Sequence, residues 1–251
     1  MPRCCRSTKA PARSREPSWC ANSLAPLDDK DWLESKLDRR LRRVAEAIRG
    51  RVHADIGTDH GLLPRYLLTS RRVERVIAVE KNPGPLARAR RELARFKAEV
   101  RQGDGLEPLS PGEIDSLSLT GMGARLIDSI LRAQPAKVPA LVVVQPNDDA
   151  HWLRTWGLET GYHLRHEELV QGTWLYEVLV FQQASGPDPA YDGLDPEVGQ
   201  RFGPHLLRRQ DPLLGQRLSR DQALFAGLNT NDPAVARKRE RVERALSHFN
   251  S

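Results

Sequence analysis

Short apolar runs alternate with helical patterns between residues 32 and 158, and this alternation restricts the possible folds more than any other feature of the sequence. Apolar runs that predict strands lie at residues 52–56, 73–79, 116–119 and 141–144, with a short one around Val100. Segments with apolar residues at helical spacing lie at 32–49, 62–68, 86–96, 124–133 and 151–158. Because strands that alternate with helices build a parallel sheet covered by helices, the sequence predicts a doubly wound α/β domain.

The next two apolar segments follow each other too closely for a parallel crossover. Residues 162–170 and 174–181 both predict strands, and only Gln171, Gly172 and Thr173 separate them. A three-residue connection can join only antiparallel neighbours, so these strands predict a hairpin. Five parallel strands that end in an antiparallel hairpin resemble the Rossmann-like sheet of the class I methyltransferases.

Beyond the hairpin the sequence predicts a linker and then only helices. Residues 184–191 are rich in glycine and proline, which is typical of a linker. Asp211-Pro212 and Asp232-Pro233 each place an N-cap before a proline at the first helical position, so a helix is expected to begin at each. Apolar residues recur near heptad spacing in both, which predicts a small antiparallel, coiled-coil-like helical hairpin. We therefore expect a tail at 1–28, the α/β domain at 29–184 and a helical subdomain at 185–251.

The charge of the chain is concentrated in arginine-rich clusters. The net charge is +6, and basic residues gather at 39–43, 88–97 and 237–241. Such clusters suit a polyanionic partner, although the acidic residues interleaved with them are also typical of solvated helix faces. No apolar run approaches the roughly 20 residues that span a bilayer, which argues against a membrane protein.

All three cysteines lie near the amino terminus, at Cys4, Cys5 and Cys20. The folded body therefore has no disulfide or zinc site, no metal is expected, and a reducing, cytoplasmic compartment is favoured. Residues 1–22 superficially resemble an organellar transit peptide, but prolines interrupt any amphipathic helix there. We favour a disordered tail or an over-long gene start.

The loop after the first predicted strand carries the most specific chemistry. Asp55 ends the strand, and Gly57 and Gly61 allow a sharp turn and a close approach to a ligand. Asp59 stands between them, where a glycine is common. A carboxylate here repels a dinucleotide pyrophosphate but attracts the cationic sulfonium and amino groups of S-adenosylmethionine, so the loop favours that cofactor over NAD. The alternative is a tight turn capped by Asp59.

Acidic residues at the ends of the next two strands strengthen this interpretation. Glu80 closes the second strand about 20 residues beyond the loop, where a carboxylate accepts hydrogen bonds from ribose hydroxyls. Asp104, in Gly103-Asp104-Gly105, follows the third strand and is placed to accept one from the adenine amino group. Each alone is equally well explained as a cap or turn residue; together with the loop they predict a three-point cofactor site.

Two further motifs follow the fourth and fifth strands. Gly121-Met122-Gly123 offers backbone groups and a soft thioether, although Met122 is equally well explained as core filler. The amides of Gln145-Pro146-Asn147 suit hydrogen bonds to the edge of a base; Asn147 alternatively caps the next helix. His60, which belongs to the loop after the first strand, is a candidate site residue or else a structural imidazole packed under that loop.

These motifs together resemble the TrmK family, bacterial tRNA (adenine-N1) methyltransferases that modify adenine 22. The likeness is carried by Leu37-Asp38-Arg39-Arg40-Leu41, Asp55-Ile56-Gly57-Thr58-Asp59-His60 with Leu63-Pro64, Gly103-Asp104-Gly105-Leu106, Gly121-Met122-Gly123, Gln145-Pro146-Asn147 and Tyr176-Glu177. It extends from about residue 33 to the end, since the family also has a C-terminal helical hairpin. Thr120 and Ala124 depart from the small alanine and glycine expected there, and the first thirty residues are unmatched.

The resemblance implies an S-adenosylmethionine-dependent enzyme whose partner is tRNA, with no obligate protein partner evident. It implies cofactor contacts from Asp55, Gly57, Thr58, Glu80, Asp104, Gly105, Gly121, Met122 and Gly123. It also implies substrate contacts from Gln145, Pro146, Asn147, Arg39 and Arg43, with the helical subdomain binding tRNA phosphates.

The implied reaction needs no strong base, because adenine N1 already carries a lone pair. The enzyme must expose that atom, which lies on the pairing edge, and stabilise the positive charge that develops on the ring. We expect Asp59 to provide the stabilising carboxylate and His60 to position it or the base. Competing interpretations are a methyltransferase for another RNA position, a protein or a small molecule, a dinucleotide-dependent oxidoreductase, and a non-catalytic RNA-binding protein.

Overall fold

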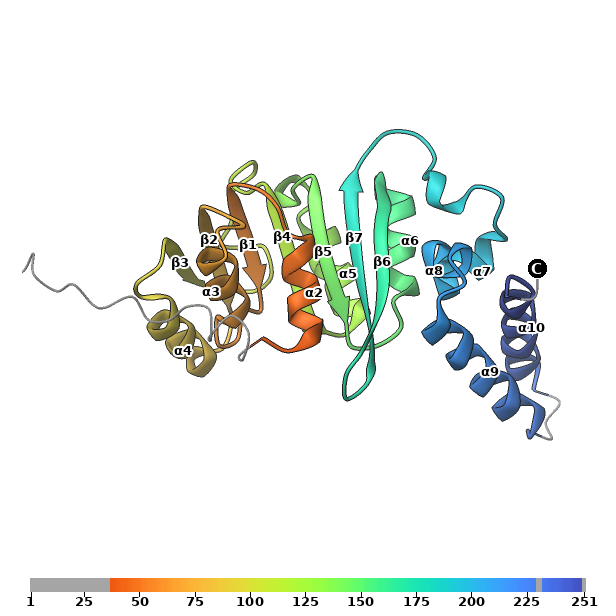
Figure 1. Ribbon diagram of the computed structural model, residues 1–251. Coiled ribbons are helices and arrows are strands. Elements are labelled where there is room, and N and C mark those ends of the chain that lie inside the picture. Colours follow the sequence, from red (N-terminus) through yellow and green to blue (C-terminus); the bar gives the residue numbers. More distant parts are fainter. Residues whose placement is uncertain (1–36, 229–231, 250–251) are drawn as a thin grey trace, which may run out of the picture.

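The structure is a computed structural model that describes residues 37–228 and 232–249, and its centre is a seven-stranded sheet. The strands are β1 (Val52–Ile56), β2 (Arg75–Glu80), β3 (Ala98–Gln102), β4 (Ser116–Met122), β5 (Leu141–Pro146), β6 (Tyr162–Gln171) and β7 (Leu175–Gln183). They lie in the order β3-β2-β1-β4-β5-β7-β6 (Figure 1). Strands β1 to β5 pair in parallel, and β7 pairs antiparallel with both β5 and β6. The predicted parallel sheet with a terminal antiparallel hairpin is confirmed.

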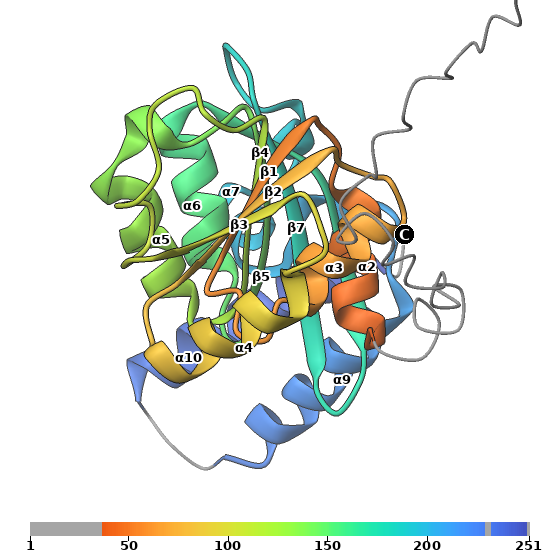
Figure 2. The same cartoon turned by 90° about the vertical axis from the view of Figure 1, so that its left-hand side faces the viewer.

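Helices cover both faces of the sheet, as a doubly wound fold requires. They are α2 (Arg39–Ala47), α3 (Leu62–Thr69), α4 (Pro83–Leu93), α5 (Ala124–Ala133), α6 (His151–Thr160), α7 (Pro196–Phe202), α8 (Pro204–Arg208), α9 (Pro212–Ala226) and α10 (Pro233–Ser247), with short 3-10 turns η2 (Pro135–Lys137) and η3 (Pro189–Tyr191). Figure 2, seen from the β3 edge, shows α5 and α6 on one face and α2 and α3 on the other. None of the helices in the described part of the chain is long and apolar enough to cross a membrane.

Strand alternation divides the core into two layers. Ala54 and Ile56 of β1 face α5 and α6 and are buried with Leu119 and Val144 of the neighbouring strands. The other face packs α2 and α3 against residues such as Val143. The chain order reverses between β1 and β4, which lie side by side, so the carboxyl ends of these two strands form the switch point where ligands of such folds bind.

The boundaries differ from the sequence predictions in a few places. Strand β2 begins at Arg75 rather than at Val73, because residues 70–74 turn out of α3 and Arg71 takes a left-handed conformation (φ 55°). Helix α4 begins at Pro83, three residues earlier than predicted, since proline suits the first turn. Helix α2 begins at Arg39 with Asp38 as its N-cap, so the predicted helix is wrong at residues 37 and 38, whereas its residues 32–36 lie outside the described part of the chain.

The segment predicted as a linker is instead fixed to the sheet. Asp188 is buried, and its carboxylate accepts hydrogen bonds from the backbone N–H groups of Leu164 (2.7 Å) and Ala190 (2.9 Å). The His163 ring also bonds the carbonyl of Gly186 at 3.0 Å. The Asp188 carboxylate thus accepts hydrogen bonds from backbone N–H groups that would donate to water if the segment were a free linker.

The C-terminal helices form their own small core beside the β6 edge (Figure 1). Asp211 and Asp232 cap α9 and α10, as their sequences predict. The buried residues of this core include Leu214 and Leu218 of α9 and Val242 of α10, which pack with α7, α8 and Leu169 of β6. The helical hairpin is therefore attached to the sheet through α7 and α8, two short helices whose separate existence the sequence did not indicate.

Candidate active site

The loop between β1 and α3 depends on residues that tolerate left-handed backbone. Gly57 (φ 69°), Asp59 (φ 50°) and Gly61 (φ 74°) all lie in that region. The backbone N–H groups of Gly57 and Thr58 both donate to the carbonyl of Val79, which ties the loop to β2. A Cβ at Gly57 would clash with Met122 Cε, so the glycine lets the loop lie against the end of β4.

Asp55 lies under this loop at the end of a buried hydrogen-bonded chain. Its carboxylate accepts a 2.6 Å hydrogen bond from Ser118 Oγ. Since the single hydroxyl proton of Ser118 is used there, its oxygen accepts from His53 Nε2 at 2.9 Å, and His53 Nδ1 accepts from Ser116 Oγ at 2.8 Å. Burial lowers the pKa of His53 to about 3, so this imidazole is neutral. Burial also raises the pKa of Asp55 to about 6, against the opposing effect of the Ser118 hydrogen bond.

Asp59 and His60 form a pair on the exposed side of the loop. Asp59 Oδ2 lies 2.8 Å from His60 Nδ1, and the Asp59 side chain is 62% exposed. Arg88 Nη1 lies 2.5 Å from His60 Nε2. Because an arginine can only donate, Nε2 accepts and Nδ1 carries the proton that bonds Asp59. The geometry thus gives His60 the neutral form that orients the Asp59 carboxylate.

Glu80 is buried at the end of β2 and holds two backbone segments. Its carboxylate accepts hydrogen bonds from the N–H groups of Asp59 (3.1 Å) and Asn82 (2.8 Å), one on each oxygen. Each oxygen keeps a second lone pair, so Glu80 can still accept hydrogen bonds from the hydroxyl groups of a ligand in the cavity. The same side chain therefore shapes the loop and offers an acceptor to a ligand.

Asp104 follows β3 and is paired with a neighbouring cation. Its carboxylate lies 2.5 Å from Lys81 Nζ, an interaction that the sequence predictions did not include. Gly105 has φ 55°, and a Cβ there would lie 3.0 Å from Ile130 of α5. This glycine thus leaves the space between Asp104 and α5 open.

The end of β4 is held by the turn after β5. Gln145 is fully buried, and its Oε1 accepts hydrogen bonds from Arg40 and from the backbone N–H of Gly121 (3.1 Å). Asn147 Nδ2 donates to the carbonyl of Gly121 at 2.6 Å. Asn147 therefore does not cap the following helix, α6, whose first N–H, that of His151, donates to Asp149 at 3.3 Å. The neighbouring Asp148 accepts from Ala124 N at 2.6 Å at the start of α5.

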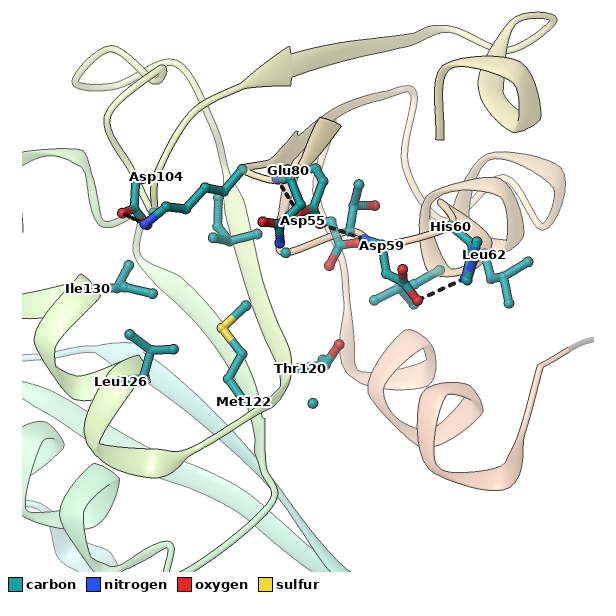
Figure 3. Close-up of a pocket in the computed structure, with 18 of the residues that line it drawn as sticks. Asp55, Asp59, His60, Leu62, Glu80, Asp104, Thr120, Met122, Leu126 and Ile130 are labelled. Atoms are coloured by element: carbon teal, nitrogen blue, oxygen red, sulfur yellow. Dashed lines mark hydrogen bonds and ion pairs between the residues drawn. The ribbon is translucent and has the colours of Figure 1, made fainter. Parts of the chain in front are cut away.

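These side chains surround a cavity of about 490 Å³ at the carboxyl ends of β1, β2, β3 and β4. Its wall contains ten of the predicted residues, namely Asp55, Gly57, Thr58, Asp59, His60, Glu80, Asp104, Gly105, Gly121 and Met122. Figure 3 shows Leu126 and Ile130 on the opposite side of the cavity from His60 and Leu62. The strand ends, the glycines and the family resemblance together thus predicted most residues of this wall.

The other predicted residues lie outside this wall. Gly123 and Gln145 support it from behind, Asn147 and Pro146 line a second cavity, and Arg39 is exposed at the start of α2. Arg43 is bound to two carboxylates, those of Glu46 (2.8 Å) and Glu168 (3.1 Å), which raises its pKa. A phosphate contact from Arg43 would have to compete with these pairs.

The sequence predictions missed several residues of the wall. Arg40 reaches the cavity from α2, with its guanidinium 5.3 Å from the centre of the Tyr176 ring. Lys81 lines the cavity beside Asp104, with which it forms an ion pair, and Leu126 and Ile130 line it from α5. The last two carried a signal, since they stand four residues apart beside the buried stripe of Ile127 and Leu131.

The composition of the wall fits S-adenosylmethionine. Four carboxylates, from Asp55, Asp59, Glu80 and Asp104, face a ligand whose sulfonium and amino groups are positive. Leu126 and Ile130 provide an apolar surface for a flat base, and the glycines keep the cradle open. Within residues 37–228 and 232–249, no group of three side chains could hold a metal ion.

Comparison with known proteins gives consistent matches. A family model described as TrmK, tRNA (adenine(22)-N(1))-methyltransferase, matches residues 53–249. A Bacillus subtilis (strain 168) protein named tRNA (adenine(22)-N(1))-methyltransferase is 36% identical over 204 residues, which cover 76% of this chain and 85% of the relative. The crystal structure of the B. subtilis M1A22 tRNA methyltransferase TrmK matches with a TM-score of 0.75 and 32% identity, covering 84% of this chain and 99% of that one. A Streptococcus pneumoniae structure in complex with S-adenosyl-L-methionine matches with a TM-score of 0.74 and 25% identity over the same shares.

Proposed function

The chain belongs to the TrmK family, and on that premise we propose that it transfers the methyl group of S-adenosylmethionine to N1 of adenine 22 in tRNA. The observation that carries the proposal is the ring of carboxylates around a single cavity at the switch point of the sheet. This arrangement suits a cationic cofactor and disfavours a pyrophosphate, which makes a dinucleotide-dependent oxidoreductase a poor alternative.

The cofactor supplies an electrophilic methyl group when it is bound. We assign its ribose hydroxyls to Glu80 and its adenine to Asp104, between Gly105 and Ile130. Lys81 must then share Asp104 with the adenine amino group or move aside. Asp55 lies under the loop of Gly57 and Thr58, where its carboxylate favours the positively charged amino group of the cofactor.

The chemistry that this chain must provide is charge stabilisation rather than proton removal. The lone pair of adenine N1 attacks directly, and positive charge then develops on the ring. We assign the stabilising carboxylate to Asp59, oriented by the neutral His60 and, through it, by Arg88. The exposure of Asp59 is consistent with contact to a base that enters from outside.

The target adenine would enter beside the end of β4. There the backbone of Gly121 and Met122 is fixed by Asn147 and by the buried Gln145, so these two amides position the entry side of the cavity. We assign Asn147 and Pro146, which line the second cavity, to contacts with the tRNA just outside the cofactor cavity, and assign Gln145 to holding Arg40 at the rim. Arg39 is exposed beside this rim and suits a phosphate.

The two parts of the chain would divide the work. We propose that residues 29–184 bind the cofactor and catalyse the transfer, whereas residues 185–251 bind tRNA phosphates through the basic face of α10. We place the enzyme in the cytoplasm, where its substrate is found.

A direct test incubates the purified protein with methyl-labelled S-adenosylmethionine and unmodified tRNA, and identifies the labelled nucleoside after digestion. We expect 1-methyladenosine. Labelled N6-methyladenosine or a labelled pyrimidine would mean another RNA methyltransferase, and a protein that binds S-adenosylhomocysteine but labels no tRNA would exclude the proposal. Calorimetry with S-adenosylhomocysteine and NAD separates the two cofactor classes independently.

A further inference from the structure

A second cavity, of about 810 Å³, opens on the other side of the turn that follows β5. Its walls come from that turn, from the turn between β6 and β7, and from α7 and α9. The side chains that matter here are Asn147, Gln171, Trp174, Arg217, Gln216 and Arg220. This cavity thus lies where the sheet meets the C-terminal helices, and the reaction assigned above does not use most of it.

The two cavities share a thin wall. Asn147 lines the second cavity, and its Nδ2 donates to the carbonyl of Gly121, which lines the first. The Asn147 backbone N–H also donates to the carbonyl of Met122 at 2.8 Å. One layer of residues therefore separates the cofactor site from the second cavity, so the two cavities are close enough for neighbouring units of one polymer.

Trp174 stands at the rim of the second cavity with 72% of its surface exposed. The other tryptophans in the described residues are used within the fold: Trp156 packs against Tyr162 and Phe181, and Trp152 lies under the Arg125 guanidinium. An indole left in water adds little to stability, whereas its flat face is well suited to stacking on a nucleobase.

The charges of the cavity leave one arginine available. Arg201 is bound to Asp149, and Arg217 lies 2.9 Å from Glu177, so both are neutralised by carboxylates. Arg220 is exposed, and no carboxylate pairs with it among the residues that the structure describes. The amides of Asn147, Gln171 and Gln216 add donors and acceptors suited to base edges. A stacking ring, a free guanidinium and amides together match a nucleotide.

We propose that the second cavity binds a nucleotide of the tRNA adjacent to the target adenine, with its base stacked on Trp174 and a phosphate on Arg220. The proposal rests on the proposed function and extends it to the way in which the substrate is held. When the target adenine leaves the base stack, the neighbouring base loses its stacking contact with it. Stacking of that neighbouring base on Trp174 would offset part of this loss.

The test compares methylation kinetics of unmodified tRNA by the full chain and by Trp174→Ala, Trp174→Phe and Arg220→Ala. We expect Trp174→Ala to raise the KM for tRNA about 5- to 100-fold, as loss of one stacked base does. Trp174→Phe should recover most of this loss because it keeps a stacking face, and Arg220→Ala should raise the KM and reduce its dependence on salt. The affinity for S-adenosylhomocysteine should not change in any of the three.

Matched controls are Leu158→Ala, an apolar side chain that is 38% exposed on α6, and Arg165→Ala, an exposed arginine six residues before the end of β6 and therefore about 20 Å from the turn. Both should leave the KM for tRNA unchanged. If the wild type methylates tRNA and Trp174→Ala does so with the same KM, the inference is wrong and the exposed indole serves a protein partner instead. If the wild type methylates no tRNA, it is the proposed function that fails.

Iodide quenching gives a second readout that does not depend on activity. The difference in quenchable fluorescence between the wild type and Trp174→Phe reports the exposure of Trp174 alone. We expect bound tRNA to abolish this difference and S-adenosylhomocysteine to leave it intact. An equal difference with and without saturating tRNA would contradict the proposal.

Discussion

The pKa of Asp55 depends on its burial and on a chain of three side chains behind it. His53, Ser116 and Ser118 form a buried hydrogen-bonded chain that delivers one donor to its carboxylate, while burial makes the ionised form costly. The pKa of about 6 is raised above the value of an exposed aspartate, so the folded protein binds more protons than the unfolded chain between these two values. This contribution to stability is therefore greatest at low pH and is lost as the pH rises through about 6.

Cofactor binding should show the opposite pH dependence. Only the ionised form of Asp55 attracts the cationic amino group, so we expect the affinity for S-adenosylhomocysteine to increase as the pH rises from 5 to 7, with a midpoint near 6. Calorimetry across this range measures it. In Asp55→Asn the affinity should be low and nearly independent of pH, and an affinity that falls over the same range in the wild type would exclude this role for Asp55.

Asp59 should affect the chemical step and spare cofactor binding. The Asp59→Asn variant removes the charge, keeps the shape and tolerates the left-handed backbone at φ 50°. We expect kcat to fall roughly 100- to 1,000-fold, the usual range for loss of one group that stabilises developing charge. The affinity for S-adenosylhomocysteine should be close to that of the wild type. Equal losses in both would make Asp59 a cofactor ligand and not a catalytic residue.

At the scale of elements, a buried cation joins the sheet to the C-terminal helices. Arg154 of α6 is fully buried and binds Glu167 of β6 (2.7 Å) and Glu177 of β7 (2.5 Å). Glu177 also binds Arg217 of α9, and Glu167 accepts from the backbone N–H of His205 at 2.9 Å. One network therefore fixes α6, the hairpin, α8 and α9 in their relative positions.

Removal of this cation should be costly. In Arg154→Met two carboxylates stay buried without their partner, so we expect a loss of about 3–5 kcal/mol in the free energy of unfolding, measured with urea. The control is Arg132→Met, which removes a half-exposed ion pair to Asp128 and Glu159 and should cost less than about 1 kcal/mol. Similar losses in the two variants would show that the buried network does not stabilise this junction.

The sequence predicted helices and strands well wherever a local pattern within one segment determines the element. Apolar runs and helical spacing placed every strand to within a few residues, and proline after aspartate marked the starts of α9 and α10. What it could not show are contacts between distant segments. The fixation of 184–191 by Asp188, the pairing of Lys81 with Asp104 and the burial of Gln145 behind Arg40 all join residues that no local pattern connects.

At the scale of the whole molecule, the basic clusters should act on tRNA affinity alone. Arg237 is exposed on α10, away from the cavity wall. We expect Arg237→Glu to weaken tRNA binding and to reduce the slope of log affinity against log salt by about one, as for a single phosphate contact. Filter binding at several salt concentrations measures both. Arg165→Glu serves as the control for a change of surface charge, and a slope identical in the two variants would remove α10 from the tRNA-binding surface.

The position of methyl transfer tests all three scales together, because it requires the loop chemistry, the second cavity and the C-terminal helices to hold one tRNA in a single register. Two tRNA transcripts that differ only at position 22, one with adenine and one with guanine, are incubated with the enzyme and labelled S-adenosylmethionine. We predict 1-methyladenosine at position 22 of the first transcript and no label in the second. Equal labelling of both transcripts would contradict it.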